Sequence, residues 1–308
     1  MSIAALFPGQ GSQSVGMAEP WLTHPAGKEI IEEASDAWGR DVVALCNDEV
    51  ALSTTEVVQP AVFACDVAAF RVLRAEGVEV AAAAGHSLGE FAALVAAGAL
   101  ELGPAIRTVI IRGEAMQAAS DAVPSTMTAV LGLSSDEAAE LCEIAGRGDV
   151  LQVANENAPS QVVLSGTVAA IERAEELARS RSAKAIRLKV AGAFHSPLMK
   201  PALAKVRESI AGLSFKEPAF AVIPNVSGRP TTEPSALRDL LSRQMTAPVR
   251  WETTMHSAAE IGVTKYVELG PGDVLTKLAR RCVKGAEATA VGSPEDAAAF
   301  AAAVREAE

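Results

Sequence analysis

The pentapeptide Gly85-His86-Ser87-Leu88-Gly89 is the stretch whose residue types and spacing most directly suggest chemistry. It fits the pattern GxSxG, with an apolar run over 78–84 before it and another over 88–99 after it. A buried strand that turns sharply into a helix exposes such a serine at the helix N-terminus, where free N–H groups and the helix dipole stabilise negative charge. A serine that only caps a helix between packing glycines fits the pentapeptide as well. The flanking strand and helix favour a nucleophile.

A serine nucleophile needs a general base, and the chain contains four histidines. His86 adjoins Ser87, but on a tight turn its ring should point elsewhere. His24 and His256 lie in stretches without a pattern and are expected at the surface. His195 stands where an expected strand breaks into a loop. By itself, such a histidine fits a structural role as well as a catalytic one.

The elements that must position these residues are short apolar runs alternating with amphipathic helical stretches, which is typical of an α/β protein with a largely parallel sheet. Between residues 125 and 196 the order changes to β-α-β-β-α-β, with Ser134 and Thr167 as helix caps, which predicts a ferredoxin-like unit. We therefore expect a large α/β domain over 1–124 and 197–308 with a small subdomain inserted over 125–196. In the large domain, the expected strands are 3–7, 78–84, 219–225 and 265–269, and the expected helices are 62–76, 88–99, 107–119, 199–211, 235–245 and 297–304.

Composition narrows the classes of function. The 308-residue chain has a formal net charge of −11, which argues against a nucleic-acid partner. The first residues lack a basic signal-peptide region, and the longest apolar run, 91–100, is about half of what spans a bilayer. The four cysteines are widely spaced and suggest neither disulfides nor a zinc site. We expect a cytoplasmic monomer without a membrane partner or a metal.

Several short motifs occur along the chain in a recognisable order. Together they resemble the malonyl-CoA:acyl carrier protein transacylase family of fatty-acid synthesis, whose fold also serves as the acyltransferase domain of polyketide synthases. The resemblance runs from residue 3 to about 281 and implies a hydrolase-like α/β core, with a mainly parallel sheet and an inserted ferredoxin-like subdomain. The motifs are Phe7-Pro8-Gly9-Gln10-Gly11-Ser12-Gln13, Gly85-His86-Ser87-Leu88-Gly89-Glu90, Arg112-Gly113 with Met116-Gln117, Phe194-His195-Ser196, Ile223-Pro224-Asn225-Val226-Ser227-Gly228, Pro248-Val249-Arg250-Trp251 and Glu268-Leu269-Gly270-Pro271-Gly272.

The resemblance implies a ping-pong reaction in which Ser87 takes a malonyl group from coenzyme A and passes it to the phosphopantetheine thiol of an acyl carrier protein. It assigns His195 as the base and implies that a backbone carbonyl near Gln244 orients the imidazole in place of an acidic residue. The backbone N–H groups of Leu88 and Gln10 are implied to form the oxyanion hole. Coenzyme A enters as a thioester substrate, and no further cofactor is implied.

Four more residues take binding roles by resemblance. Arg112 is implied to bind the free malonyl carboxylate, for which a guanidinium offers a bidentate fork, although helical spacing alone also fits a surface arginine. Phe194 would crowd out a methyl group, as in polyketide acyltransferases where Ala-Phe-His accompanies malonyl specificity. Gly192 departs from the histidine usual in that signature. Asn155 and Gln59 match positions that line the acyl pocket, or they bond to local backbone.

An acidic carrier protein and a phosphorylated coenzyme conflict with the negative net charge unless basic side chains gather locally. We expect at least one of two basic clusters to border the mouth of the Ser87 cleft. Two other functions remain open: a trans-acting acyltransferase of a polyketide synthase, and a serine thioesterase or hydrolase. A non-catalytic carrier-binding protein is disfavoured by the Ser87, His195 and Arg112 set. The subdomain cluster is Arg179, Arg181, Lys184, Arg187 and Lys189, and the C-terminal cluster is Lys277, Arg280, Arg281 and Lys284.

Overall fold

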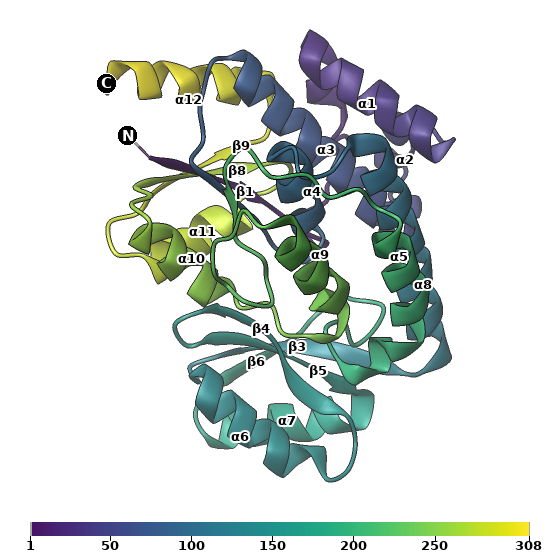
Figure 1. Ribbon diagram of the computed structural model, residues 1–308. Helices are drawn as coiled ribbons and strands as arrows, with labels where there is room; N and C mark the ends of the chain where they lie inside the picture. Colours follow the sequence, from purple (N-terminus) through teal and green to yellow (C-terminus); the bar gives the residue numbers. More distant parts are fainter. Residues whose placement is uncertain (1, 308) are drawn as a thin grey trace.

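The computed structural model describes residues 2–307 as two sheets with helices packed on them (Figure 1). One sheet has five parallel strands in the order β7-β2-β1-β8-β9, and the other has four antiparallel strands in the order β4-β5-β3-β6. The predicted fold class is confirmed. The parallel strands are β1 (Ile3–Phe7), β2 (Ala82–Gly85), β7 (Ala221–Val222), β8 (Lys265–Leu269) and β9 (Glu287–Val291).

Strand β1 lies at the centre of the parallel sheet, and all five of its residues are apolar and buried. It pairs with β2 from Ala4 opposite Ala82 to Phe7 opposite Gly85. The two strands therefore end side by side, and the loops that follow them meet at one edge of the sheet. In open α/β sheets this carboxyl edge is where ligands bind.

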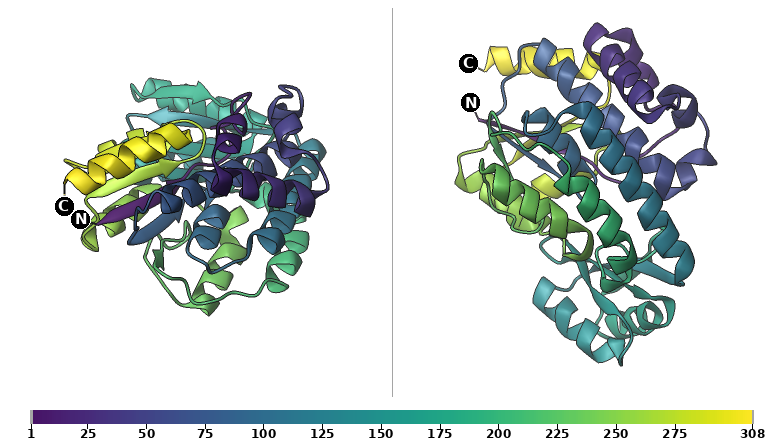
Figure 2. Two further views of the ribbon diagram at one scale, coloured as in Figure 1. Left: turned by 90° about the horizontal axis from the view of Figure 1, so that it is seen from above. Right: turned by 45° about the vertical axis from the view of Figure 1, so that its right-hand side comes forward.

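Helices cover both faces of the parallel sheet, as the two views of Figure 2 show. On one face, α3 and α4 pack against β1 and β2 in the larger hydrophobic core, and α5 packs on α3. On the other face, Leu6 and Ala84 pack with Trp251 and Met255 of α10 and with Leu278 of α11. The helices are α1 (Pro25–Trp38), α2 (Val42–Cys46), α3 (Thr55–Ala75), α4 (Gly89–Ala96), α5 (Leu102–Ala122), α8 (Lys200–Ala211), α9 (Pro234–Arg243), α10 (Trp251–Glu260), α11 (Val274–Cys282) and α12 (Pro294–Glu306). Short 3-10 turns are η1 (Glu19–Thr23), η2 (Ala51–Ser53), η3 (Pro197–Met199) and η4 (Gln244–Thr246).

The antiparallel sheet has a core of its own between the sheet and two helices. Its strand order is that of a ferredoxin-like unit, as the sequence predicts. Ser134 and Thr167 cap the two helices as predicted, and Ser134 forms a capping box with Glu137. We propose that 125–196 form the small subdomain and that 1–124 with 197–308 form the large domain. The small unit contains β3 (Ser125–Leu131), α6 (Ser135–Gly146), β4 (Leu151–Ala158), β5 (Gln161–Thr167), α7 (Val168–Ser180) and β6 (Lys184–Arg187).

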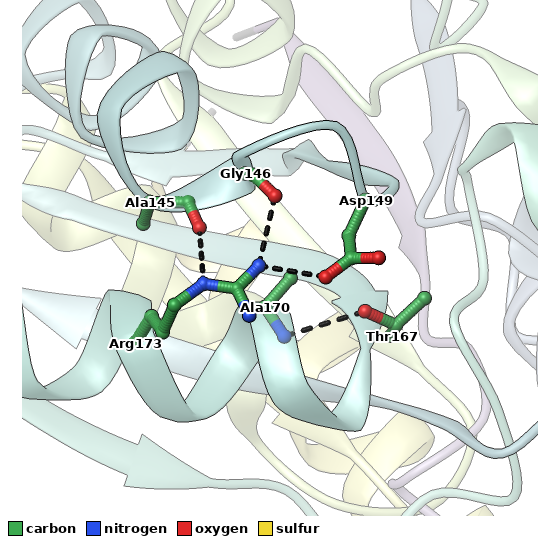
Figure 3. A network of polar contacts seen from close by, with 6 residues as sticks. All are labelled: Ala145, Gly146, Asp149, Thr167, Ala170 and Arg173. Atoms are coloured by element: carbon green, nitrogen blue, oxygen red, sulfur yellow. Dashed lines mark hydrogen bonds and ion pairs between the residues drawn. The ribbon is translucent and has the colours of Figure 1, made fainter.

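An arginine fastens the two helices of this small unit together (Figure 3). Arg173 of α7 donates to the carbonyl oxygens of Ala145 and Gly146 at the end of α6, at 2.7 and 2.8 Å, and to Asp149 at 2.7 Å. The carbonyls at a helix C-terminus lack partners within the helix and carry partial negative charge. The guanidinium satisfies both and tightens the α6–α7 contact.

Some expected elements differ from the structure. Helix α3 starts at Thr55 rather than at 62 and contains Pro60, which usually ends a helix. At the first residue of this helix, Gln117 Oε1 accepts from the Thr55 N–H at 3.0 Å and so satisfies one of the helix-end donors that lack a partner within the helix. The strand expected over 219–225 is wrong beyond Ala221–Val222, because this edge segment pairs with β2 over two residues and otherwise forms a single isolated bridge to Thr231. Helices α1, α2, α10 and α11 and strand β9 had no predicted counterpart. No helix in 2–307 is both long enough and apolar enough to cross a membrane.

Candidate active site

Ser87 lies in the turn between β2 and α4, at the carboxyl edge of the parallel sheet. Its φ of 53° is in the left-handed region, which is unfavourable for a residue with a side chain and marks a position held by its surroundings. A Cβ at Gly85 would overlap the backbone of Gly89, and a Cβ at Gly89 would overlap the carbonyl of Phe7. Both glycines are therefore required by close packing of strand, turn and helix, and the geometry is that of a nucleophile elbow.

His195 meets Ser87 across 108 positions of sequence, with 2.7 Å between Nε2 and the Ser87 Oγ. Its Nδ1 lies 3.0 Å from the carbonyl oxygen of Gln244 and 3.1 Å from that of Ala247. Because carbonyls only accept, Nδ1 carries the proton and Nε2 is free to accept one. Burial, and secondarily the charge of Arg112, lower the pKa of His195 to about 3, so the imidazole is neutral at pH 7.

Arg112 of α5 is 1% exposed and points at the nucleophile. It donates to Gln59 Oε1 at 2.6 Å, to Ser87 Oγ at 3.0 Å and to Gln244 Oε1 at 3.1 Å. Burial lowers the pKa of Arg112 to about 10, which still leaves the guanidinium charged at neutral pH. All three acceptors are neutral, and no ion pair within residues 2–307 includes this arginine. The guanidinium is a buried positive charge without a directly bonded anion.

Two residues without an assigned role in the sequence analysis hold the elbow from behind. Asn225 accepts from the Ser87 N–H at 2.7 Å and donates to the Gly85 carbonyl at 2.6 Å. Glu90, 1% exposed, accepts from the Asn225 N–H at 3.0 Å and from the Gln244 amide at 2.8 Å. The same amide donates to the Ser87 carbonyl at 2.7 Å. Both residues lie within recognised motifs, which is the signal that could have found them.

A cavity of about 100 Å³ lies in front of these groups. Phe194 lines it together with Ser87, and the amide oxygen of Asn155, also on its wall, is buried without a hydrogen-bond partner among the described residues. Gln59 bonds to Arg112 and, at 3.3 Å, to the side chain of Gln10, so the alternative of a local backbone contact does not apply to it. The other lining residues are Gln10, Gln59, His86, Leu88, Arg112, Met116, Met127, Leu188, Val190 and His195.

Three positions around the active site, Gly9, His86 and Gly192, also bear on what the sequence predicts. The first turn packs on the elbow, because a Cβ added to Gly9 would lie 3.8 Å from the backbone N of Leu88. The His86 ring bonds to Asn157 Oδ1 at 2.9 Å and so points away from the nucleophile, as expected. A Cβ at Gly192 would overlap the side chain of Ser120, so the loop has no room there for the histidine of the polyketide signature.

The two basic clusters differ in their relation to the cavities. A second cavity of about 250 Å³ shares Gln10, His86 and Asn155 with the first and extends to Leu275 and Leu278 of α11. The C-terminal cluster lies on and just after this helix, and its exposed Arg281 bonds to Gln161, which also lines the second cavity. In the subdomain cluster, three arginines pair with acids of their own unit: Arg179 and Arg187 with Glu175, and Arg181 with Glu140.

No group of metal-ligating side chains occurs among residues 2–307.

An α/β elbow serine, a neutral histidine beside it and a buried arginine together define a serine enzyme suited to acyl groups that carry an anion. The chain matches the model of the acyl transferase domain family over residues 5–307.

Known proteins of similar sequence and structure refine this class. The malonyl CoA-acyl carrier protein transacylase of Bacillus subtilis is 39% identical over 298 residues, covering 95% of this chain and 94% of that protein. The structure of the malonyl CoA-acyl carrier protein transacylase from Coxiella burnetii superposes with a TM-score of 0.94 at 37% identity, covering 98% of this chain and 97% of that one. A malonyl-transacylase solved in complex with a type II polyketide synthase acyl-carrier protein gives a TM-score of 0.92 at 38% identity, covering 96% and 98%. The chain belongs to the acyl transferase family and, within it, to the malonyl CoA-acyl carrier protein transacylases.

Proposed function

We propose that this protein transfers a malonyl group from coenzyme A to the phosphopantetheine thiol of an acyl carrier protein through an ester on Ser87, and thereby supplies fatty-acid synthesis. The observation that carries the proposal is Arg112, whose buried guanidinium lies 3.0 Å from the Ser87 hydroxyl and binds only neutral acceptors. A carboxylate on the acyl group supplies the missing anion, and the planar fork can bind it through two hydrogen bonds.

In the first half-reaction, Ser87 Oγ attacks the thioester carbonyl while His195 Nε2 accepts the hydroxyl proton. The carbonyl oxygen becomes an oxyanion, which the N–H groups of Leu88 and Gln10 stabilise; such donors contribute about 3 kcal/mol each. The intermediate expels the coenzyme A sulfur, and His195 returns its proton to it. In the second half-reaction, His195 takes the proton of the phosphopantetheine thiol, the sulfur attacks the ester, and Ser87 leaves with that proton.

The neutral partner of His195 suits a substrate that is itself an anion. The carbonyls of Gln244 and Ala247 orient the imidazole as a carboxylate does in other serine enzymes, but they add no negative charge near the malonyl group. Phe194 borders the acyl cavity and restricts a branched acyl chain, and Asn155 offers an unpaired amide oxygen to a donor of the substrate. One methyl group is worth about 1–3 kcal/mol in such a pocket.

Labelling with [14C]malonyl-CoA tests the proposed nucleophile. Ser87 should carry the label, Ser87→Ala should carry none, and His195→Ala should label far more slowly. Label that persists in Ser87→Ala would remove the proposed nucleophile. Release of free malonate without a carrier protein, at the rate of transfer, would instead identify a hydrolase.

A polyketide pathway is the second candidate, because a similar structure contains a type II polyketide synthase carrier protein. Transfer rates to a purified fatty-acid carrier and to a purified polyketide carrier separate the two. We expect the fatty-acid carrier to be the better acceptor. A reversed preference would assign the chain to polyketide synthesis.

A further inference from the structure

Glu90 is a buried carboxyl group to which the reaction steps give no task. One of its oxygens, Oε2, accepts from both the Gln244 amide and the Asn225 backbone N–H. Gln244 in turn binds the Ser87 carbonyl, and Asn225 binds the Ser87 N–H. Glu90 is thus the common anchor of the two side chains that hold the strained nucleophile turn from both sides.

Glu90 is also linked to Arg112, because the Gln244 side chain forms hydrogen bonds to both. Arg112 donates to Gln244 Oε1, and Gln244 donates from Nε2 to Glu90. Among the elements packed on α4, β1 and β2 carry no charged residue and α5 contributes the buried Arg112. The buried titratable groups of α3 are Cys65 and Asp66, and the pKa of each is raised, so both favour the neutral form. His195, neutral at pH 7, bonds to Ser87 Oγ. With Glu90 ionised, the empty site is balanced at one positive and one negative charge.

A malonyl carboxylate on Arg112 would make this balance negative among side chains that are themselves buried, since Arg112 and Glu90 are each 1% exposed. An uncompensated buried charge is strongly unfavourable, and a titratable group in such a place changes its protonation instead. Of the groups named, His195 has a pKa of about 3 and so does not take up a proton near pH 7, Asp66 has no hydrogen bond to this network, and Arg112 must keep its charge to bind the substrate. Glu90 is the group left that can restore the balance.

We propose that Glu90 is a positioning residue that takes up one proton from solvent, on its carboxylate, when a malonyl carboxylate binds Arg112. The proposal rests on the proposed function, since it needs an acyl group with a free carboxylate. Burial raises the pKa of Glu90 to about 7 in the empty site, against the lowering effects of Gln244, Asn225 and Arg112. A second carboxylate on Arg112 raises the pKa further, so the proton is taken up at neutral and mildly alkaline pH.

The consequence is a pH dependence that distinguishes malonyl-CoA from acetyl-CoA. Above pH 7 the empty site holds ionised Glu90, and binding of malonyl-CoA must include protonation. Its Kd should therefore rise at least about tenfold between pH 7 and pH 9. Acetyl-CoA has the same coenzyme but no carboxylate on the acyl group, so its Kd should change much less. The ratio of the two constants isolates the acyl carboxylate from the phosphates of coenzyme A.

Calorimetric titration at pH 8, in two buffers that differ in ionisation enthalpy, measures the protons taken up. The full chain with Ser87→Ala prevents turnover. For this variant we expect between about half and one proton per malonyl-CoA, and close to none for acetyl-CoA. The matched control is Ser87→Ala with Glu90→Gln, because the glutamine oxygen can still accept from Gln244 and Asn225 while the side chain no longer titrates. We expect no proton uptake there and a malonyl-CoA Kd that stays level to pH 9.

Two further variants separate positioning from titration in the active enzyme. Glu90→Gln should keep kcat within about threefold and give a lower KM for malonyl-CoA than the unchanged enzyme at pH 8.5, with the two values converging at pH 6. Glu90→Ala should lower kcat for malonyl-CoA and acetyl-CoA alike, because Gln244 and Asn225 lose their anchor. Equal proton uptake by both Ser87→Ala proteins would overturn the inference. The proposed function would survive that result as long as Ser87 still takes the malonyl label.

Discussion

Two arginines of this protein, Arg112 and Arg173, occupy opposite kinds of polar environment. Arg173 in the small subdomain donates to two helix-end carbonyls and to Asp149, and its side chain is 26% exposed (Figure 3). Arg112 in the large domain is 1% exposed and donates to two glutamines and to Ser87. The first guanidinium has a carboxylate of its own, and the second has none within bonding distance.

The difference shows how a structural charge can be told from a functional one. An arginine that fastens secondary structure is matched by negative groups of the chain and keeps contact with water, so its burial is compensated. An arginine held by neutral acceptors in a sealed site remains short of an anion. In the empty site, Glu90 is linked to Arg112 through Gln244 and can balance its charge, and we propose that a substrate carboxylate takes over this role as Glu90 gains a proton.

The largest effect that tests this comparison is the loss of Arg112. Arg112→Ala should lower kcat/KM for malonyl-CoA by about 10²- to 10³-fold, because it removes a desolvated partner of a buried charge, and for acetyl-CoA by less than about tenfold. Arg112→Lys keeps the charge but not the planar fork and should fall between. Steady-state kinetics with both thioesters measures the split. Equal losses for the two substrates would make Arg112 structural, like Arg173.

Arg281 of α11 extends the comparison to an exposed arginine. We propose that the C-terminal basic cluster contacts the acidic carrier protein, because α11, which carries most of this cluster, lines the second cavity beside the Ser87 cavity. Arg281→Glu should raise the KM for the carrier protein about tenfold and leave that for malonyl-CoA nearly unchanged. Arg179→Glu, a charge reversal in the subdomain cluster, is the matched control. A similar rise in both variants would indicate a general charge effect rather than a docking site.

Removal of Arg173 should affect stability and leave catalysis unchanged. Arg173→Ala is expected to lower the free energy of unfolding by about 1–2 kcal/mol, since it frees the end of α6. Malonyl transfer at 25 °C should stay within about twofold of the unchanged enzyme. Urea unfolding measures the effect. The control is Arg181→Ala, which removes an exposed ion pair with Glu140 and should change the free energy of unfolding by no more than about 0.5 kcal/mol. A large loss of malonyl transfer in Arg173→Ala would show that Arg173 also matters for catalysis and would contradict its assignment as a structural arginine.

The smallest expected effect concerns Asp66, a buried acid that lacks any compensation. Both of its oxygens are buried without a hydrogen-bond partner among the described residues, and burial, followed by the charge of Glu268, raises its pKa well above 3.8. The folded state therefore keeps a proton that the unfolded chain releases above about pH 4, so this group makes stability fall as pH rises through the folded pKa. Asp66→Asn should be more stable than the unchanged protein at pH 8, by about 1 kcal/mol in the free energy of unfolding, with a smaller difference at pH 5. Thermal unfolding at both values tests this, and a variant less stable at pH 8 would contradict it.

Local sequence was sufficient for much of the fold. Strands β1 and β8 occur where apolar runs predict them, and the caps at Ser134 and Thr167 start their helices as predicted. These features depend on neighbours along the chain, which the sequence displays directly. The start of α3 could not be predicted in this way, because it relies on Gln117, 62 positions away.

For the candidate site, too, some features follow from the local sequence and others only from the tertiary structure. By itself, the sequence determined which residue types are present, the strand–turn–helix setting of Ser87 and the family that the motifs resemble. Only the tertiary structure decided that the imidazole of His195 meets Ser87, that Arg112 binds neutral acceptors alone, and that Glu90 anchors Gln244 and Asn225. Burial, charge balance and hydrogen-bond partners arise where distant segments pack together, so no local pattern of residues contains them.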